Sequence, residues 1–246
     1  MPNTQTVLFS DLELTNIEFC KPEKNKRCNQ LIGYISYNKK PLLVKSPKKM
    51  RLDNGGVPRQ DEYHPDDASR RHIRYGENET SKEFFDVLRQ LDKQLGSDET
   101  KKKFFDSKAS KYTYIPIVRE PLHDPDDKNT VKKPPYIKLM FSTSYPDGNI
   151  TTNIFWNKEN GSPPEKQDVN TPDDALKAVP YLSTNQFIIM PNKTWAHKSN
   201  MADPKYGITF KIIQIETNHS ESDGISKLMR EGAYIGDTEY DTSNNV

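Results

Sequence analysis

The chain has 246 residues, of which 33% are hydrophobic and 29% are charged, and its formal net charge is +1. This length excludes a mini-protein that needs disulfide bonds or bound metal ions to fold. It is sufficient to form the hydrophobic core of one large domain or two small ones. No stretch approaches the roughly 18 apolar residues of a membrane span. The first residues, MPNTQTVLFSDLEL, lack the pattern of a signal peptide, and two cysteines are typical of a reducing compartment. We therefore expect an intracellular protein.

Charge is distributed unevenly along the chain. Residues 217–246 carry six acidic and two basic side chains, a net charge of −4. The remaining 34 basic and 29 acidic residues give residues 1–216 a net charge of +5. This asymmetry predicts a basic body followed by an acidic, flexible tail over residues 217–246. Residues 1–30 are interpreted as an N-terminal extension.

The first third of the chain predicts short strands and loops. Residues 31–47, LIGYISYNKKPLLVKSP, read as two strands around a polar turn at 38–41. The Gly-, Pro- and Asp-rich residues 52–69 predict a loop, and RRHIRY at 70–75 predicts a strand with a basic edge.

Two helices are expected next. Apolar residues recur at helical spacing over 81–95, and Thr80 to Glu83 have the spacing of a capping box. A second, shorter helix is predicted within DETKKKFFDSKAS at 98–110.

Strands dominate the prediction for the rest of the chain. YTYIPIV at 112–118 reads as a strand, and a loop follows it. Residues 136–156 predict a hairpin closed by the Pro-Asp-Gly turn at 146–148. TPDD at 171–174 predicts the start of a short helix.

The last two predicted strands contain the most hydrophobic part of the chain. NQFIIMPNKTWAHK at 185–198 precedes YGITFKIIQIE at 206–216. Simple alternation places Tyr206, Ile208, Phe210 and Ile212 on one face, and Thr209, Lys211, Ile213 and Ile215 on the other. Both faces carry apolar residues, so 206–216 is predicted to be a central strand.

About seven strands, one strong helix and long loops indicate an α+β, mainly β fold. We expect an OB-like small β-barrel or sandwich over residues 31–216, with a helical insertion near residues 80–110. The familiar sequence motifs of nucleotide phosphate loops, serine hydrolases and zinc proteases are missing from the sequence, so we expect no enzyme and no cofactor.

Metal binding is also not expected. HPDD at 64–67 and HDPDD at 123–127 contain His and Asp, but both lie in Pro-Asp-rich turns where aspartates serve the backbone. Cys20 and Cys28 have no second Cys/His pair at zinc-finger spacing.

Cationic and aromatic residues are interleaved in several predicted strands. Single-stranded nucleic acid requires both, because cations neutralise phosphates and aromatic faces stack on bases. Trp195 illustrates the difficulty, since lysines flank it at positions 193 and 198. It is either a core anchor at a strand end or a stacking platform on a basic surface, and aromatic residues in strands are more often core.

The order of these segments resembles a known protein family. Four segments carry the resemblance, in this order: KKPLLVKSP, FFDVLRQLD, IKLMF with ITTNIFW, and YGITFKIIQIE. Over residues 31–216, their order resembles that of a protein family of nucleocytoplasmic large DNA viruses. Some members are regarded as single-stranded-DNA-binding proteins with an OB-like core. A more distant similarity is to the podovirus type of replication protein, which also ends in an acidic tail. The chain ends in SNNV and lacks the terminal aromatic residue of that type.

The resemblance implies a role in viral DNA replication or repair, in a viral factory in the host cytoplasm or in the virion. We therefore expect a non-catalytic protein that binds single-stranded DNA. Replication proteins are possible partners of the acidic tail, a homo-oligomer is possible, and no membrane partner is expected. The alternative is a virion structural protein, a minor capsid or core component whose β-domain packs against neighbours. The residues predicted to contact nucleic acid are Tyr34, Tyr37, Lys39, Lys40, Lys45, Lys48, Lys49, Arg70, Arg71, Tyr136, Lys138, Lys193, Trp195, Lys198, Tyr206 and Lys211.

Overall fold

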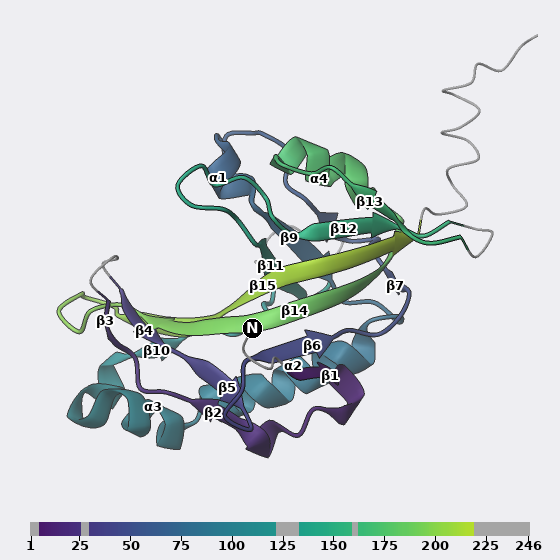
Figure 1. Cartoon of the computed structure of the whole chain (residues 1–246). Coiled ribbons are helices and arrows are strands. Elements are labelled where there is room, and N and C mark those ends of the chain that lie inside the picture. Colours follow the sequence, from purple (N-terminus) through teal and green to yellow (C-terminus); the bar gives the residue numbers. More distant parts are fainter. Residues whose placement is uncertain (1–4, 26–29, 122–132, 159–161, 219–246) are drawn as a thin grey trace, which may run out of the picture.

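The computed structural model describes residues 5–25, 30–121, 133–158 and 162–218 (Figure 1). No helix within these ranges is long and apolar enough to cross a membrane. The fold is built around one long antiparallel hairpin, formed by β14 (Thr184–Ala196) and β15 (Lys205–Asn218). Its strands pair from Thr184 opposite Asn218 to Ala196 opposite Tyr206.

Short strands pair along both edges of this hairpin. The free edge of β14 carries β4 (Leu31–Gly33), β6 (Leu42–Lys45) and β7 (Met50–Arg51). The free edge of β15 carries three parallel strands in succession, β10 (Thr113–Tyr114), β11 (Tyr136–Phe141) and β12 (Asn153–Trp156). Strand β15 is therefore central, as the sequence predicts.

The remaining strands extend this sheet outward. They are β1 (Gln5–Leu8) on β6, β3 (Glu23–Lys24) on β4, β9 (His72–Gly76) on β11, β8 (Gly55–Gly56) on β9, and β13 (Glu165–Gln167) on β12. Among the described residues the sheet has 13 strands, and β2 (Ile17–Phe19) with β5 (Ile35–Tyr37) forms a separate pair. The α+β, mainly β class is confirmed, whereas an OB-like barrel stays a prediction.

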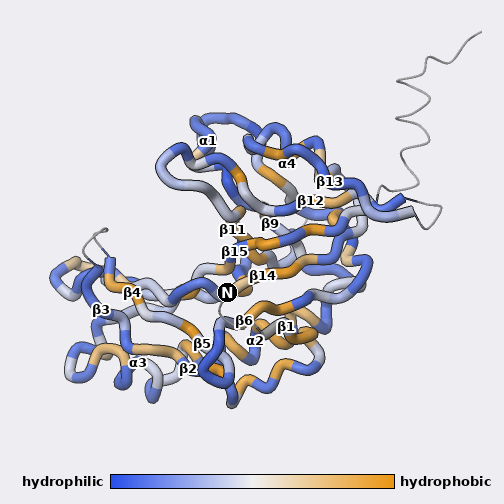
Figure 2. The backbone as a smooth tube through the Cα atoms, viewed as in Figure 1, coloured by the Kyte–Doolittle hydropathy of each residue, from blue (hydrophilic) through white to orange (hydrophobic). Residues whose placement is uncertain are grey.

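Helix α2 (Lys82–Leu95) covers one face of the hairpin. Its buried side chains meet the inward residues of β6, β14 and β15 around a cavity of only about 10 Å³, so this core is closely packed. Hydrophobic residues gather along the hairpin and around β6 and α2 (Figure 2). The other helices are α1 (Asp67–Arg70), α3 (Asp98–Phe105) and α4 (Pro172–Ala178), with 3₁₀ turns at Phe9–Asp11, Leu14–Asn16 and Asp106–Lys111.

Two β-bulges interrupt the pairing of the hairpin. Pro191 pairs with Phe210 and Lys193 pairs with Thr209, so Asn192 is an extra residue in β14. Ile213 is likewise an extra residue in β15. Each extra residue moves the residues beyond it to the opposite face of the sheet. Simple alternation is therefore wrong for Ile215, which the second bulge turns into the core.

The helix predictions are correct in position but not always in their caps. Helix α2 matches the predicted 81–95, but its N-cap residue is Ser81, whose side chain makes no capping hydrogen bond. The Thr80 hydroxyl of the predicted capping box accepts from the backbone N–H of Arg51 and donates to Asn78 Oδ1 instead, so that box is wrong. Helix α4 has a complete box: Thr171 accepts from the backbone N–H of Asp174, and the Asp174 carboxylate accepts from that of Thr171.

The hairpin predicted at 136–156 is reduced to its turn, where Thr143 and Ile150 form a single antiparallel bridge. Strands β11 and β12 do not pair with each other, because both run parallel to β15 and follow one another along its edge. The loop between them is held at both ends, where the hydroxyls of Ser142 and Thr152 donate to the Ile212 carbonyl at 2.9 and 2.8 Å. The strand predicted at 112–118 is reduced to Thr113–Tyr114.

Residues 5–25 do not form a separate extension, which corrects the predicted boundary at residue 31. Strand β1 pairs with β6, β2 pairs with β5, and Val7, Ile17 and Phe19 are buried in the core. Thr217 is also buried and donates to the Asn185 side chain at 2.9 Å, so the predicted tail cannot begin there. Residues 219–246 of that tail lie outside the described residues.

Candidate nucleic-acid interface

The face of the hairpin opposite α2 carries cationic and aromatic side chains. Inward residues of β14 are buried, whereas Lys193 and Trp195 alternate with them and are only half-buried. On β15, Thr209 and Lys211 lie on this outer face, and Lys211 pairs with Met140 of β11. A sheet that is covered on one face only leaves the other free for a ligand.

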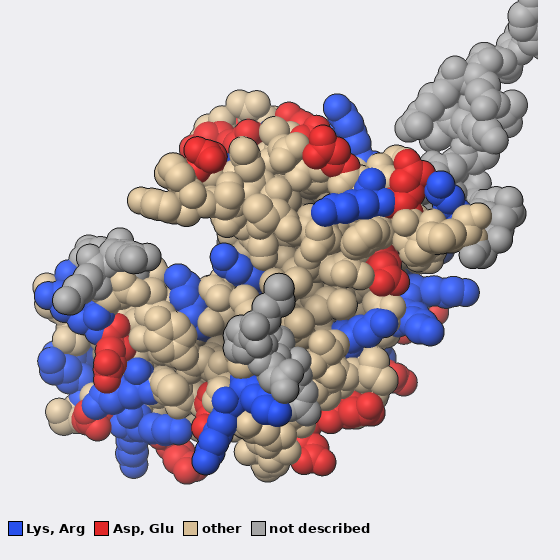
Figure 3. All heavy atoms as spheres, viewed as in Figure 1, with Lys and Arg blue, Asp and Glu red and all other residues tan. Residues whose placement is uncertain are grey.

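A cleft of about 520 Å³ opens on this outer face, and we call it the cleft pocket. Its lining includes Arg71, Lys193, Trp195 and Lys211, four of the residues that the sequence predicts. They come from β14, β15 and the segment between α1 and β9. Figure 3 shows a hollow between the part that carries α1 and the part that carries β3 and β4, with Lys or Arg atoms on its floor.

The bulge at Asn192 decides the orientation of Trp195. Phe187, Ile189 and Pro191 point into the core, and unbroken alternation would send Lys193 and Trp195 there as well. The extra residue turns both outward instead. The Trp195 ring lies over Gly207, its partner on β15, where a Cβ atom would come within 3.1 Å of the ring. The Trp195 ring also neighbours that of His197, just beyond the end of β14, at 5.5 Å between ring centroids.

In the described part of the chain the cations of the cleft pocket have no acidic ion-pair partner, although Arg71 lies near enough to Asp66 to help lower the pKa of that carboxyl. Among the described residues, none of Arg71, Lys193 and Lys211 forms an ion pair with Asp or Glu. The described lining contains no Asp or Glu either, although it does include Asn192, His197 and Thr209. Unpaired cations around a concave surface attract anions such as phosphates.

Three predicted contact residues are buried and cannot meet nucleic acid in this structure. Tyr206 is 0% exposed, packs among the rings of Phe105 and Tyr114, and donates its hydroxyl to the Leu95 carbonyl at 2.7 Å. Tyr37 points into the core from β5. Arg70 is 1% exposed, pairs with Asp67 and Asp173, and donates to the Pro58 carbonyl at 3.0 Å. These predictions are corrected: the three side chains are structural.

Other predicted residues are accessible but lie outside the cleft pocket. Lys39 and Lys40 are exposed in the tight turn between β5 and β6, where Asn38 and Lys39 both have positive φ. Tyr34 is 72% exposed beside β4, and Lys48 and Lys49 are exposed after β6. Lys45 lies on β6 opposite Ile188, and Lys198 follows the end of β14. The pocket therefore brings together only part of the predicted set.

Tyr136 and Lys138 line a second pocket, farther along β11. Both are on the face of β11 that also carries Met140 of the cleft pocket. The guanidinium carbon of Arg74 lies 3.7 Å from the centroid of the Tyr136 ring. Sequence reasoning noted Arg74 only as part of the basic edge of RRHIRY and did not count it as a contact residue. It missed Arg119 here and His197 in the cleft, because the residues around each of them come from distant segments.

Stability should fall on acidification because of His72, which lines the second pocket. Burial, together with the nearby charges of Lys138 and His64, lowers the pKa of His72 from 6.5 to about 3. The folded protein keeps this ring neutral, whereas the unfolded chain takes up a proton below pH 6.5, so acid favours unfolding. The stabilising contribution is complete above pH 6.5 and is lost toward about pH 3.

We expect this one group to lower the free energy of unfolding by up to about 1.4 kcal/mol per pH unit within that window. Urea unfolding at about pH 7 and about pH 5 measures the difference in wild type and in His72→Gln. The variant should lose less stability between the two conditions. Equal losses in both proteins would contradict the assignment.

The predicted loop motifs serve the backbone where they are described. Asp66 accepts from the backbone N–H of Ser69 at the start of α1, and Asp61 accepts from those of Tyr63 and His64. Within the described part of the chain, no three His, Cys, Asp or Glu side chains gather in a metal-binding arrangement. Residues 123–127 and Cys28 lie outside the described residues.

Comparison with known proteins gives one informative similarity. No family model matches the chain. A protein of Acanthamoeba polyphaga mimivirus, described as uncharacterized, is 27% identical to it. The match includes 87% of this chain and 61% of the mimivirus protein, so the chain spans less than two thirds of that relative's length. Over most of its own length, the chain is therefore similar to a protein of a nucleocytoplasmic large DNA virus.

Proposed function

We propose that the cleft pocket binds single-stranded DNA and that the protein acts without catalysis in viral DNA replication or repair. The observation that carries the proposal is the convergence of Arg71, Lys193 and Lys211 around Trp195 in one concave pocket, whose described lining includes no acidic residue. Cations follow the phosphates, and the aromatic ring stacks on a base.

Single strands suit this geometry better than duplex. A tryptophan ring can stack only on a base whose face is free, and in duplex DNA neighbouring bases cover those faces. The binding surface is an outer face of a long hairpin, and it does not depend on a closed OB-like barrel. The similarity to a mimivirus protein supports a viral setting, and a viral factory in the host cytoplasm is the location we propose. Replication proteins are the proposed partners of the acidic tail.

Fluorescence titration with oligo-dT at low and high salt tests the proposal. Trp156→Phe leaves Trp195 as the sole tryptophan reporter. We expect binding to quench its emission, with an affinity that falls as salt rises. A virion structural protein would show neither effect.

Absence of binding at low salt would contradict the proposal, provided that the acidic tail is not responsible. A second form truncated after Asn218 removes that tail and keeps Thr217 in the sheet. If this form also fails to bind at low salt, the cleft does not bind single-stranded DNA.

A further inference from the structure

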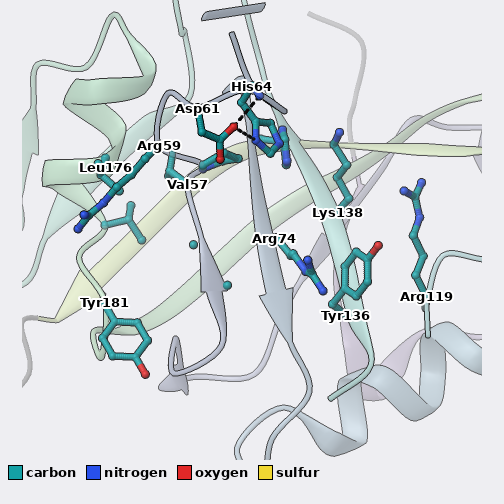
Figure 4. A pocket seen from close by; sticks show the side chains of 15 residues that line it. Val57, Arg59, Asp61, His64, Arg74, Arg119, Tyr136, Lys138, Leu176 and Tyr181 are labelled. Atoms are coloured by element: carbon teal, nitrogen blue, oxygen red, sulfur yellow. Dashed lines mark hydrogen bonds and ion pairs between the residues drawn. The ribbon is translucent and has the colours of Figure 1, made fainter. Parts of the chain in front are cut away.

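The second pocket, of about 570 Å³, lies between the strands β8, β9 and β11 and the helix α4. This volume is within the range of small-molecule sites. Four cationic side chains line it: Arg59, Arg74, Arg119 and Lys138. Figure 4 shows Arg74, Arg119, Lys138 and Tyr136 on one side of the space and Tyr181 on the other.

Positive charge in this pocket is not balanced. Asp61 is the only acidic residue in the described lining, and its carboxylate already accepts from two backbone N–H groups and contacts His64 at 3.1 Å. Among the described residues, none of the four cations forms an ion pair. Burial, reinforced by Arg119, lowers the pKa of Lys138, so the bare pocket disfavours its own charge. A polyanion would relieve this repulsion.

Aromatic rings lie beside the cations of the second pocket. The Arg74 guanidinium is stacked on Tyr136, which fixes the plane of its donors. Across the pocket, Tyr181 is 62% exposed, while its hydroxyl donates to the Asp53 carbonyl at 2.9 Å. That tether holds an accessible aromatic ring at the rim, where it can stack on a planar ligand.

One buried polar atom of the described lining lacks a well-formed hydrogen bond. His72 is 5% exposed, and its Nδ1 makes no well-formed hydrogen bond among the described residues, although a contact with the Ser69 backbone opposes the lowering of its pKa. Buried polar atoms are normally satisfied, and exceptions occur at functional sites.

We propose that the second pocket binds a nucleotide, with the phosphates against Arg74, Arg119 and Lys138 and the base toward Tyr181. Its chemistry fits either a free nucleoside phosphate or the 5′-phosphorylated end of a DNA strand. It shares no described lining residue with the cleft pocket, so this proposal does not rest on strand binding there.

Calorimetric titration of the full chain in magnesium-free buffer tests the proposal. The probes are dTTP, thymidine, and oligo-dT of one length with either a 5′-phosphate or a 5′-hydroxyl. We expect dTTP or the phosphorylated end to bind, and thymidine not to bind. In Arg119→Gln/Lys138→Gln, that phosphate-dependent affinity should fall at least about tenfold, as expected when charge-assisted hydrogen bonds are lost. The exposed α3 pair Lys102→Gln/Lys103→Gln is the matched control.

The outcomes distinguish a free nucleotide from a 5′-phosphorylated strand end as the ligand. They also distinguish nucleotide binding in the second pocket from strand binding in the cleft pocket. Tight dTTP binding assigns the pocket to free nucleotides, and a preference for only the 5′-phosphorylated strand assigns it to strand ends. Unchanged binding of 5′-hydroxyl oligo-dT by the double variant would show that the cleft works independently. The proposal is overturned if no phosphate-bearing probe binds in preference to its phosphate-free counterpart, or if the folded double variant binds like wild type. Competition between pyrophosphate and dTTP on the wild-type chain tests the phosphate contacts without a variant, and failure to compete overturns them.

Discussion

Neutralising the three cleft cations together, in Arg71→Gln/Lys193→Gln/Lys211→Gln, is expected to weaken oligo-dT binding on the order of 100-fold at low salt. Each phosphate contact with a single strand contributes about 0.7 to the slope of log affinity against log salt concentration, so three lost contacts should reduce that slope by about 2. Fluorescence titration over a series of salt concentrations measures both quantities. Because none of the three side chains forms an ion pair with a described acid, the fold should tolerate the change.

A charge-matched control is available on the helices. Lys82→Gln/Lys102→Gln/Lys103→Gln also removes three positive charges and takes the net charge from +1 to −2, but its exposed lysines lie on α2 and α3. This variant should keep the wild-type slope, apart from a small general effect of net charge. Equal losses in the two triple variants would show that binding follows overall charge and not the cleft.

Replacing the ring in Trp195→Ala is expected to weaken binding about tenfold to a hundredfold, because base stacking contributes about 1–3 kcal/mol per base. The side chain points out of the core and rests on Gly207, so the melting temperature should fall by no more than about 4 °C. Removal of a core tryptophan would instead cost about 3–5 kcal/mol. Binding followed by fluorescence anisotropy of a labelled oligonucleotide, together with a thermal melt, gives both readings.

The conservative variant Trp195→Phe separates stacking from simple bulk. A phenylalanine ring can still stack, so most of the affinity should return, whereas Trp195→Leu should stay weak. If leucine restored binding as well as phenylalanine, the residue would act by filling space. A large fall in stability without a specific loss of affinity would show that Trp195 acts as a core residue and not as a stacking platform. Its neighbours in the sequence are compatible with either role.

Local patterns in the sequence identified most of the elements but not their partners. The helical spacing of Phe84, Leu88 and Leu91 is a property of neighbouring residues, so α2 could be predicted. The partner of β11 could not be predicted in this way, because its alternating residues would suit either β12 or the edge of β15. Parallel pairing along β15 depends on where Ser142 and Thr152 are anchored, which is a contact between distant segments.

The candidate site was likewise predictable only where neighbouring residues in the sequence determine it. Interleaved lysine and aromatic residues drew attention to Lys193 and Trp195, which do face outward, but the same pattern describes Lys211 and Tyr206, of which only the lysine is accessible. Tyr206 is buried because α3 supplies an aromatic cluster around it, and nothing near position 206 in the sequence indicates that helix. Arg70 reads as a free cation until Asp173, far along the chain, pairs with it.

The extra residue at Asn192 also has a consequence for comparing sequences. Loss of that one residue would leave a regular ladder, with Pro191 opposite Phe210 followed by Lys193 opposite Thr209, and every side chain would keep its face. Loss of two residues between Pro191 and Trp195 would instead exchange the cleft and the core at the end of the strand. A gap of one residue between Pro191 and Trp195 is therefore compatible with an outward-facing Trp195, whereas a gap of two residues there is not.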